Sequence, residues 1–481
     1  MMDKKRLAYP QAEKRTQHAP RSRNSFRPIA ALLAAMLCLS ACGTQITPAP
    51  QASSAATASG EPAVASDRTA SASATASPGE SASPAGESAQ ATSGTTAPDP
   101  ENTTNAASTD GASESTTPSS VTLSTNRTIS TSNGQPIKVK ALYLTGPKCG
   151  AALDDYIAIA NDTEINALVI DIKETGVNYE PDVPLCQELK LYTKFYDVDK
   201  VLQKCHENGI YVIGRIVVFR DNALAQKMPA YAIRKPDGSF WLENKSKTGA
   251  WTSPAVPEVL DYNIAIAKDA VARGFDEIQF DYVRFPTVTK SNQAAYPADM
   301  PDKIDVINGF LEKASQQIKA VRDVPVSADV FGIIAESVAD GKAIGQQLEY
   351  LGMNADYLNP MVYPSHFANA GTGVMGNGVG QQVNGVLFTA PDLRPYDVVL
   401  QSLLKTKKRA DAQQGFKAGI RPYLQDFTAG YIKNTAYYQT YGPKQLREQI
   451  QAVYDAGYEE WILWNGKNIY SVDGLLPEDA D

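Results

Sequence analysis

From residue 137 onward, short apolar segments alternate with longer segments in which apolar residues recur every three or four positions. The short segments are rich in Val, Ile and Tyr, which is typical of β-strands, and the longer ones have the period of amphipathic helices. Helices are predicted at 197–208, 257–273, 302–321, 396–413 and 443–456. Eight strands are predicted, at 137–146, 167–174, 210–219, 277–285, 324–332, 355–363, 418–427 and 459–465.

This alternation of eight strands with helices predicts an α/β fold, a (β/α)8 TIM barrel. A doubly wound open sheet is the alternative, but no glycine-rich phosphate-binding motif follows the first strand. In a barrel of this kind, the active site forms at the carboxyl ends of the strands.

The chain before the barrel has two segments of different composition. Eight Lys and Arg residues precede an apolar run of about 14 residues, which is shorter than the ~20 residues of a membrane span. This layout predicts a signal peptide at 1–41, and the sequence Leu39-Ser40-Ala41-Cys42 resembles the bacterial lipobox, which implies lipidation of Cys42. Residues 42–120 are mostly Ala, Ser, Thr, Pro and Gly, which predicts a disordered linker and leaves 121–481 for the barrel. A cleaved signal with an unmodified cysteine, or an uncleaved anchor, is the alternative.

The N-terminal features predict a secreted protein that is lipid-anchored to the outer face of the bacterial cell membrane. Removal of the signal peptide takes away eight positive and two negative charges, and so shifts the net charge from −8 to −14. Because nucleic acid is itself a polyanion, a surface this acidic disfavours it as a partner.

Three cysteines remain in the predicted barrel. Cys149 and Cys186 fall in segments predicted as loops after successive strands, whereas Cys205 falls in a predicted helix. In an oxidising compartment we expect a disulfide between Cys149 and Cys186, with Cys205 buried as a small apolar residue. No Cys or His cluster has the spacing of a zinc site, so neither a metal nor a cofactor is expected.

Charged and polar residues gather at the predicted strand ends, where strand parity decides which of them face the barrel interior. In "GFDEIQFDYVRFP", residues 274–286, the parity turns Gln279 and Asp281 inward and Ile278, Phe280 and Tyr282 toward the helices. Because burying unpaired charge is costly, a ring of such residues indicates either a functional site or a network of ion pairs.

Three motifs, "IGRIVVFRD" (213–221), "GFDEIQFDYVRFP" (274–286) and "YLNPMVYPSHF" (357–367), resemble those of a bacterial family named the putative glycosyl hydrolase domain, and the resemblance runs from about Val139 to the end. In the α-amylase-like and α-galactosidase-like barrels, which are similar, a nucleophilic Asp ends the fourth strand, where Asp281 stands. The acid of the α-amylase-like barrels is a Glu at the end of the fifth strand, where this chain has Asp329. The α-galactosidase-like barrels take their acid from the sixth strand, which has no carboxylate here.

The first hypothesis is a cell-surface glycoside hydrolase that cleaves a polysaccharide or cell-wall glycan with two carboxylates. Asp281 is the predicted nucleophile, kept ionised by Arg284, and Asp329 is the predicted general acid. Glu174 and Asp426 are reserve acids. The residues predicted to bind substrate are Asp171, Lys173, Arg215, Arg284, Asn359, Tyr363, His366, Gln425 and Trp464.

The second hypothesis is a non-catalytic barrel that binds carbohydrate or associates with the cell wall, and in which the acids pair with Lys173, Arg215 and Arg284. A long insertion after the third strand, residues 220–257, bears on substrate contacts under either hypothesis. Its Trp241 and Trp251 suit two interpretations, stacking on sugar rings or filling a small core of the insertion itself.

Overall fold

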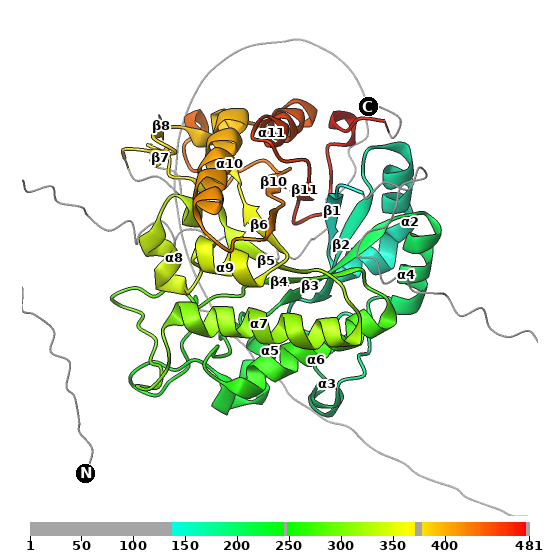
Figure 1. Cartoon of the computed structure of the whole chain (residues 1–481), viewed down its shortest axis with the longest axis vertical. Helices are drawn as coiled ribbons and strands as arrows, with labels where there is room; N and C mark the ends of the chain where they lie inside the picture. Colours follow the sequence, from blue (N-terminus) through cyan, green and yellow to red (C-terminus); the bar gives the residue numbers. More distant parts are fainter. Residues whose placement is uncertain (1–136, 245–247, 371–377, 478–481) are drawn as a thin grey trace, which may run out of the picture. The chain divides into compact units, whose positions relative to one another are not determined.

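The computed structural model describes residues 137–244, 248–370 and 378–477 (Figure 1). The predicted signal peptide at 1–41, the lipidation site Cys42 and the linker at 42–120 lie outside these residues, as does the start of the barrel domain, which was predicted at 121. In the described part of the chain, no helix is both long and apolar enough to cross a membrane.

Parallel strands form a closed barrel, which confirms the predicted (β/α)8 fold. The strand β6 pairs with both β9 and β10, β10 pairs with β11, and β11 returns to β1. The barrel strands are β1 Lys140–Leu144, β2 Ala167–Lys173, β3 Tyr211–Val217, β4 Glu277–Asp281, β5 Val326–Phe331, β6 Tyr357–Met361, β9 Gly419–Ile420, β10 Tyr423–Gln425 and β11 Trp461–Trp464.

The seventh barrel strand is divided into β9 and β10 by Arg421 and Pro422. Proline has no N–H to donate to a neighbouring strand, so the ladder is interrupted there. The flanking groups keep the strand in register, because the Arg421 N–H donates to the Leu358 carbonyl at 3.0 Å and the Pro422 carbonyl accepts from the Ile462 N–H at 2.9 Å. The interrupted strand therefore still counts as the seventh of eight.

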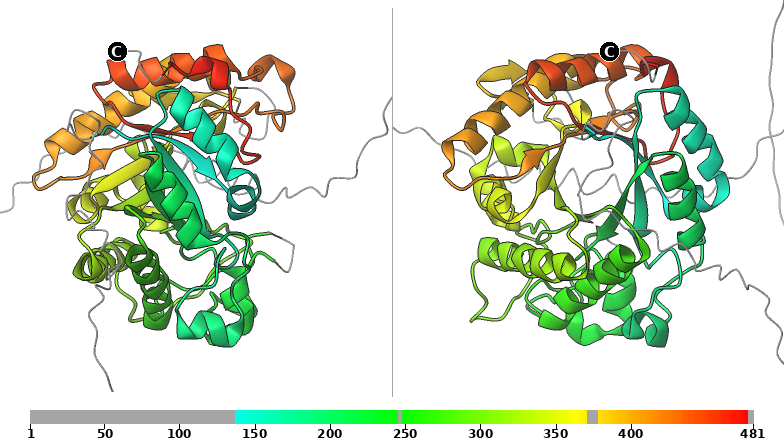
Figure 2. Two further views of the ribbon diagram at one scale, coloured as in Figure 1. Left: turned by 90° about the vertical axis from the view of Figure 1, so that its right-hand side faces the viewer. Right: turned by 45° about the vertical axis from the view of Figure 1, so that its right-hand side comes forward.

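Helices surround the barrel, as the right-hand view of Figure 2 shows. They are α2 Gly146–Asp162, α3 Pro184–Leu189, α4 Val198–Glu207, α5 Asn222–Lys227, α6 Pro257–Arg273, α7 Lys303–Val321, α8 Val338–Ile344, α9 Leu348–Asn354, α10 Pro395–Ala412 and α11 Pro443–Asp455. The five predicted helices correspond to α4, α6, α7, α10 and α11. A hairpin, β7 Gln381–Val383 with β8 Val386–Phe388, lies outside the barrel sheet.

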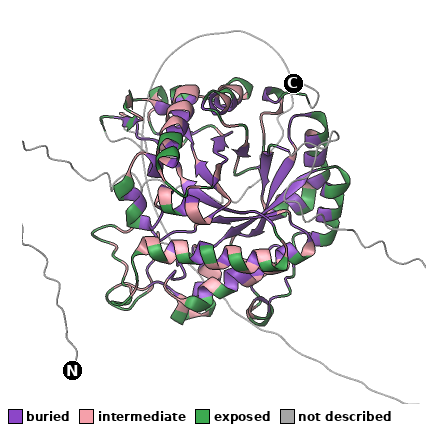
Figure 3. Ribbon diagram, viewed as in Figure 1, coloured by how far each residue is buried: buried purple, intermediate pink, exposed green. Residues whose placement is uncertain are grey.

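The barrel strands are buried on both faces, whereas the helices expose their outer sides (Figure 3). Outward side chains of the strands pack on the helices, and the Phe280 ring lies 5.1 Å from the Phe310 ring of α7. Inward side chains form a separate cluster inside the barrel that includes Tyr143, Ile213 and Tyr423. This alternation confirms the predicted parity of β4 from Ile278 to Asp281.

The long insertion after β3 packs its two tryptophans into the main hydrophobic core. Trp241 and Trp251 are 1% and 0% exposed, and their rings meet edge to face at 6.3 Å. Stacking on a sugar is therefore wrong, and the small separate cluster of Ala225, Ala232 and Ala250 does not include these two residues. Asp237 and Gly238 form a turn in this insertion, where Gly238 has a φ of 82°.

The three described cysteines, Cys149, Cys186 and Cys205, are buried and unpaired, so the predicted bridge between Cys149 and Cys186 is wrong. Both residues lie in helices, α2 and α3, instead of in loops. The Cys186 thiol interacts with Tyr262 of α6, whereas the Cys149 thiol interacts with Cys205 of α4. The two thiols therefore belong to different helix contacts.

Candidate active site

A cavity of about 1470 Å³ opens at the carboxyl ends of the barrel strands. Drug-sized ligands occupy pockets of about 300–1,000 Å³, so this cavity has room for an oligosaccharide. Among its lining residues, the charged side chains of Asp171, Arg215, Asp281 and Asp329 come from four neighbouring strands, β2 to β5. The cavity therefore lies where the sequence predicts the active site.

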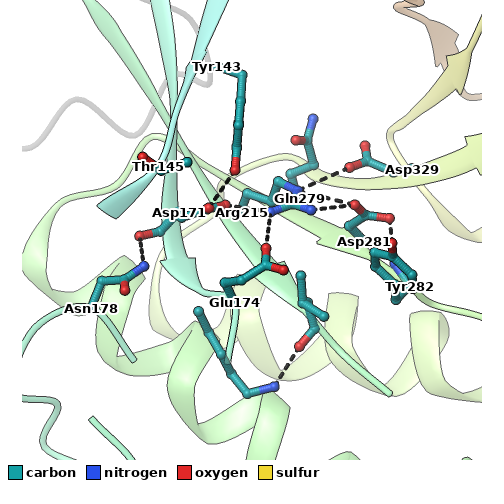
Figure 4. Close-up of polar contacts among 12 residues, drawn as sticks. Tyr143, Thr145, Asp171, Glu174, Asn178, Arg215, Gln279, Asp281, Tyr282 and Asp329 are labelled. Carbon is teal, nitrogen blue, oxygen red and sulfur yellow. Dashed lines mark hydrogen bonds and ion pairs between the residues drawn. The ribbon is translucent and has the colours of Figure 1, made fainter. Parts of the chain in front are cut away.

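Arg215, in β3, is the hub of the charged groups (Figure 4). Its Nη2 lies 2.6 Å from Asp281 Oδ2, and its Nη1 lies 2.5 Å from Asp171 Oδ1 and 3.3 Å from Glu174 Oε2. Its Nε lies 3.8 Å from Asp329 Oδ2. One buried guanidinium is thus shared by four carboxyl groups, and the local charge is dominated by acid.

Two aromatic rings also contact the guanidinium of Arg215 and help to hold it in place. The Tyr143 and Trp464 rings lie 5.3 and 5.4 Å from its central carbon, and they stack on each other at 4.0 Å. The Tyr143 hydroxyl also donates to Asp171 Oδ2 at 2.6 Å. Tyr143 was missed by the sequence analysis, although the inward parity of β1 in "ALYL" was a signal that could have identified it.

Asp281, the last residue of β4, is held by both the side chain of Arg215 and the main chain. Its Oδ1 accepts from the N–H of Tyr282 at 2.5 Å. Tyr282 has a φ of 50°, a left-handed conformation that costs a non-glycine residue about 1–2 kcal/mol. That conformation turns the Tyr282 ring into the cavity wall, so the prediction that it faces the helices is wrong.

Asp329, on β5, is a buried carboxyl in a different environment. Its Oδ1 accepts from Asn359 Nδ2 at 3.0 Å, and its main-chain carbonyl accepts from Gln346 Nε2 at 3.1 Å. Burial raises the pKa of Asp329 well above its ordinary range, and the negative charge of Asp281 raises it further, against the opposing effect of Arg215. Asp329 therefore keeps its proton under conditions in which an exposed carboxyl is ionised.

The distance between the two carboxyl groups is bounded by their common partner. The Nε of Arg215 lies 3.2 Å from Asp281 Oδ2 and 3.8 Å from Asp329 Oδ2, so these two oxygens are at most about 7 Å apart. Carboxyl separations are about 5–5.5 Å in retaining glycosidases and about 6.5–9.5 Å in inverting ones. This bound on the nearest oxygens is compatible with the separation of a retaining glycosidase.

A third buried carboxyl, Asp171, shares Arg215 with this pair. Burial raises the pKa of Asp171 to about 7, although Arg215 opposes the shift. Its main-chain carbonyl accepts from Asn178 Nδ2 at 2.8 Å and from the Tyr196 hydroxyl at 3.0 Å. Asp171 is thus a fixed group in the cavity wall, as predicted for a residue that orients substrate.

Of the reserve acids, Glu174 lines the cavity with its side chain 42% exposed, between Arg215 and Arg220. Asp426 also lines the cavity, but its two oxygens accept from the N–H and the hydroxyl of Ser471 at 2.8 and 2.7 Å. Burial raises the pKa of Asp426. Its bonds to Ser471 leave it less free than Asp329 to exchange a proton with a substrate.

Tyr363, His366 and Trp464 line the cavity, as predicted for substrate contacts. Burial lowers the pKa of His366 to about 4, so its imidazole is neutral near pH 7 and can both donate and accept a hydrogen bond. The rings of Tyr363 and His366 meet edge to face at 5.0 Å. Tyr363 and His366 give the cavity an aromatic and weakly polar wall, whereas the Trp464 ring lies over the guanidinium of Arg215.

Three residues predicted to contact substrate lie away from the cavity. Lys173 pairs with Asp221 at 2.8 Å on the helix side of the sheet, because the register of β2 shifts between Asp171 and Lys173. Asn359 does not reach the cavity and instead donates a hydrogen bond to Asp329. Gln425 donates to Asp392 and accepts from Ser365, and so ties loops together.

Arg284 reaches the cavity wall, but it makes no ion pair with Asp281 among the described residues. The ion pair with Asp281 that was predicted for Arg284 is made instead by Arg215. Arg215 lies on the neighbouring strand, where parallel pairing sets Val217 beside Asp281 and brings the guanidinium under its carboxylate. Within the described residues, no group of three or more His, Cys, Asp or Glu side chains is arranged to hold a metal ion.

Comparisons with other proteins extend these observations. The family model described as the putative glycosyl hydrolase domain matches residues 141–470. No match emerges from the curated proteins. Among solved structures, the chain is similar to a hypothetical protein from Ruminiclostridium thermocellum ATCC 27405, with 41% identity, a TM-score of 0.36, and coverage of 39% of this chain and 97% of that one.

Two further solved structures have names that state an activity. The glycoside hydrolase domain of PgaB (BpsB) from Bordetella bronchiseptica is 14% identical, with a TM-score of 0.48 and coverage of 69% of this chain and 95% of that one. A chitinase from Chromobacterium violaceum ATCC 12472 is 13% identical, with a TM-score of 0.40 and coverage of 70% and 97%.

Proposed function

We propose that this chain, which belongs to the putative glycosyl hydrolase domain family and is a glycoside hydrolase, cleaves a polysaccharide with retention of anomeric configuration. The observation that carries the mechanism is the pair of carboxyl groups on one guanidinium. Asp281 is paired directly with Arg215, whereas burial and the charge of Asp281 raise the pKa of Asp329. When their environments give two neighbouring carboxyl groups different affinities for a proton, the two groups can take different roles in catalysis.

In the first step, the Asp281 carboxylate attacks the anomeric carbon while the Asp329 carboxyl gives its proton to the departing glycosidic oxygen. The bond from the sugar to the leaving group breaks as the bond to Asp281 forms. In the second step, the Asp329 carboxylate takes a proton from water, and the resulting hydroxide displaces Asp281 from the sugar. Oδ2 of Asp281 accepts from both Nε and Nη2 of Arg215, whereas Oδ1 accepts only from the N–H of Tyr282 and so keeps a free lone pair for the attack.

The ion pairs of Arg215 with Asp171 and Asp281 are of the kind that a non-catalytic barrel would also contain. What favours catalysis is that these acids outnumber the cation and line an open cavity instead of closing it. A screen of the full-length chain against bacterial wall glycans and exopolysaccharides, with detection of new reducing ends, tests the proposal. The anomeric signals of the first product in ¹H NMR should show retention, and initial inversion would contradict the assigned roles.

The proposed place of action is the outer face of the cell membrane, with Cys42 as the lipidated N-terminus and residues 42–120 as a tether. The support is the lipobox-like sequence that ends at Cys42, together with the composition of the following segment. Cys42→Ser should release the chain from the membrane fraction or block its processing. Membrane retention and processing equal to the wild type would contradict lipid anchoring.

A further inference from the structure

Arg284 is a second buried arginine at the cavity, and its surroundings differ from those of Arg215. The residue is 2% exposed and lines the cavity beside Tyr282 and Phe331. Three rings surround its guanidinium carbon, with Trp251 at 4.8 Å, Tyr282 at 5.2 Å and Phe331 at 4.7 Å. The cation is thus held by the faces of aromatic rings.

No acid among the described residues touches the guanidinium of Arg284, although the charges of Glu243 and Asp281 act on it from farther away. Its Nη1 donates to the Phe285 carbonyl at 3.0 Å, but its Nη2 is buried and has no hydrogen-bond partner in the described part of the chain. No ion pair of Arg284 occurs there either. Burial accordingly lowers the pKa of Arg284. A buried cation of this kind is destabilised until an anion joins it.

The mouth of the cavity also carries unpaired positive charge. Lys190, Lys227 and Lys467 line the cavity, are exposed, and take part in no ion pair within the described residues. These three exposed lysines add positive charge to a cavity whose buried part is dominated by acid. Exposed charges of one sign around a cleft attract ligands of the other sign.

We propose that the cavity accepts a glycan whose sugar at the cleaved bond, or next to it, carries a negatively charged substituent, and that Arg284 pairs with this substituent. The shared chemistry is a carboxylate, sulfate or phosphate group, each of which accepts the forked hydrogen bonds of a guanidinium. The inference rests on the proposed function, because it takes the sugar to lie between Asp281 and Asp329.

The position follows from the rings around Arg284. Tyr282 directly follows Asp281 in the chain, and Phe331 lies two residues beyond Asp329. A sugar held between the two carboxyls therefore lies beside the same rings that surround the guanidinium. Because Tyr282 and Phe331 are half-buried, pairing requires one of these rings to turn and widen the exposed edge of Arg284.

The test compares binding of matched oligosaccharides to the full-length chain by isothermal titration calorimetry. Uronic-acid oligosaccharides are compared with the same oligosaccharides after reduction of their carboxyls to alcohols. Sulfated and phosphorylated oligosaccharides are compared with their desulfated and dephosphorylated forms. The wild type should bind at least one charged form about tenfold more tightly than its neutral counterpart. The pair that shows the difference identifies the substituent.

Arg284→Gln should abolish this difference, and Arg284→Lys should keep part of it. Arg234→Gln is the matched control, because Arg234 also lies over a ring, that of Phe240 at 4.3 Å, but away from the cavity. If Arg284→Gln does not fold, the wild type is tested alone for a rise in melting temperature with glucuronate, glucose 6-sulfate or glucose 6-phosphate over glucose at equal ionic strength. No rise would overturn the proposal.

Equal affinity of the wild type for charged and neutral forms, or a charge preference retained in Arg284→Gln, would overturn the inference about Arg284. Reducing-end detection on the same oligosaccharides reports separately on the proposed function. If only neutral glycans are hydrolysed, the inference about Arg284 is contradicted and the proposed function is supported. Tight binding of charged glycans that depends on Arg284, with no hydrolysis of them or of any other glycan, supports the inference and sinks the proposed function.

Discussion

Two layers of buried charge lie inside the same barrel, at opposite ends of β4. Glu277 begins the strand and accepts from Arg421 Nη1 at 2.9 and 3.1 Å, whereas Asp281 ends it and accepts from Arg215. The two acids point to the same face, about 13 Å apart along the strand. Each layer is an ion pair between an arginine and a carboxylate of the same sheet, yet the two pairs differ in what they do.

The charges at the start of β4, Glu277 and Arg421, form what we call the lower layer, and those at its end, around Arg215 and Asp281, form the upper layer. The lower layer is closed off from the cavity. Both oxygens of Glu277 are satisfied, since Ser327 donates to one at 2.5 Å and Tyr211 to the other at 3.3 Å, and neither Glu277 nor Arg421 lines the cavity. In the upper layer, Arg215 serves several acids that face open space. The difference shows that surplus acid beside a cavity, rather than buried charge itself, marks the catalytic end.

The largest effect is expected for Asp281→Asn, which should lower turnover on an active glycan by about 10⁴-fold or more because it removes the nucleophile. Its melting temperature should stay near that of the wild type or rise. One acid fewer then shares Arg215, so the repulsion among the remaining carboxyl groups is smaller. Near-normal turnover, or an unfolded chain, would place Asp281 with the scaffold of the lower layer.

Asp329→Asn should lower turnover on an ordinary glycan by about 10²–10⁴-fold, because the leaving oxygen is no longer protonated. A dinitrophenyl glycoside has a leaving group that needs no proton, so formation of the glycosyl-enzyme on it should be nearly preserved. The measurement is the pre-steady-state burst on both substrates, with Asp171→Asn as the control. An equal loss on both substrates would assign the acid elsewhere.

The pH dependence of activity also tests the assignment of Asp329 as the general acid. Because the pKa of Asp329 is raised, its protonated form persists to higher pH, and activity on ordinary glycans should fall as the pH rises through that value. This fall is the alkaline limb of the pH profile. It should disappear when Asp329→Asn acts on the dinitrophenyl glycoside, and its persistence there would exclude Asp329 as its source.

The sequence predicted much of the fold and of the upper layer, because strand parity is a local property. The eight strands, the inward positions of Asp171 and Asp281, and the site at the strand ends all follow from period-two alternation. The short helices α3, α5, α8 and α9 were missed because six or seven residues hold too few helical periods to form a clear pattern. Neither helix pairing nor the packing of thiols can be obtained from spacing, which is why the disulfide was wrong.

The residues misplaced within the site share a different cause, which is local irregularity of the backbone. A register shift after Asp171 turned Lys173 to the helix side, and a left-handed residue after Asp281 turned Tyr282 into the cavity. Parity counting assumes a regular strand, so it fails at both points. The central role of Arg215 was hidden for another reason, because its partners lie up to 114 residues away from it in the chain.

Glu277→Gln tests the lower layer and should cost about 3–5 kcal/mol of unfolding free energy, because Arg421 is left buried without its main partner. Urea unfolding measures the loss, and turnover of the folded enzyme at 25 °C should remain close to that of the wild type. Asp281→Asn provides the opposite pattern as the control. A variant of wild-type stability with impaired turnover would mean that the lower layer takes part in catalysis.

The smallest effect is expected when both partners of the lower pair are replaced, in Glu277→Gln combined with Arg421→Met. Removing a buried pair together costs less than breaking it, because no uncompensated charge remains, so about 1–3 kcal/mol of the single-variant loss should return. A double-mutant cycle by urea unfolding measures this coupling, and additive losses would show that Glu277 and Arg421 act independently. The same exchange in the upper layer, Asp281→Asn with Arg215→Met, should restore no turnover, since there the acid acts on the substrate and its cation only holds it in place.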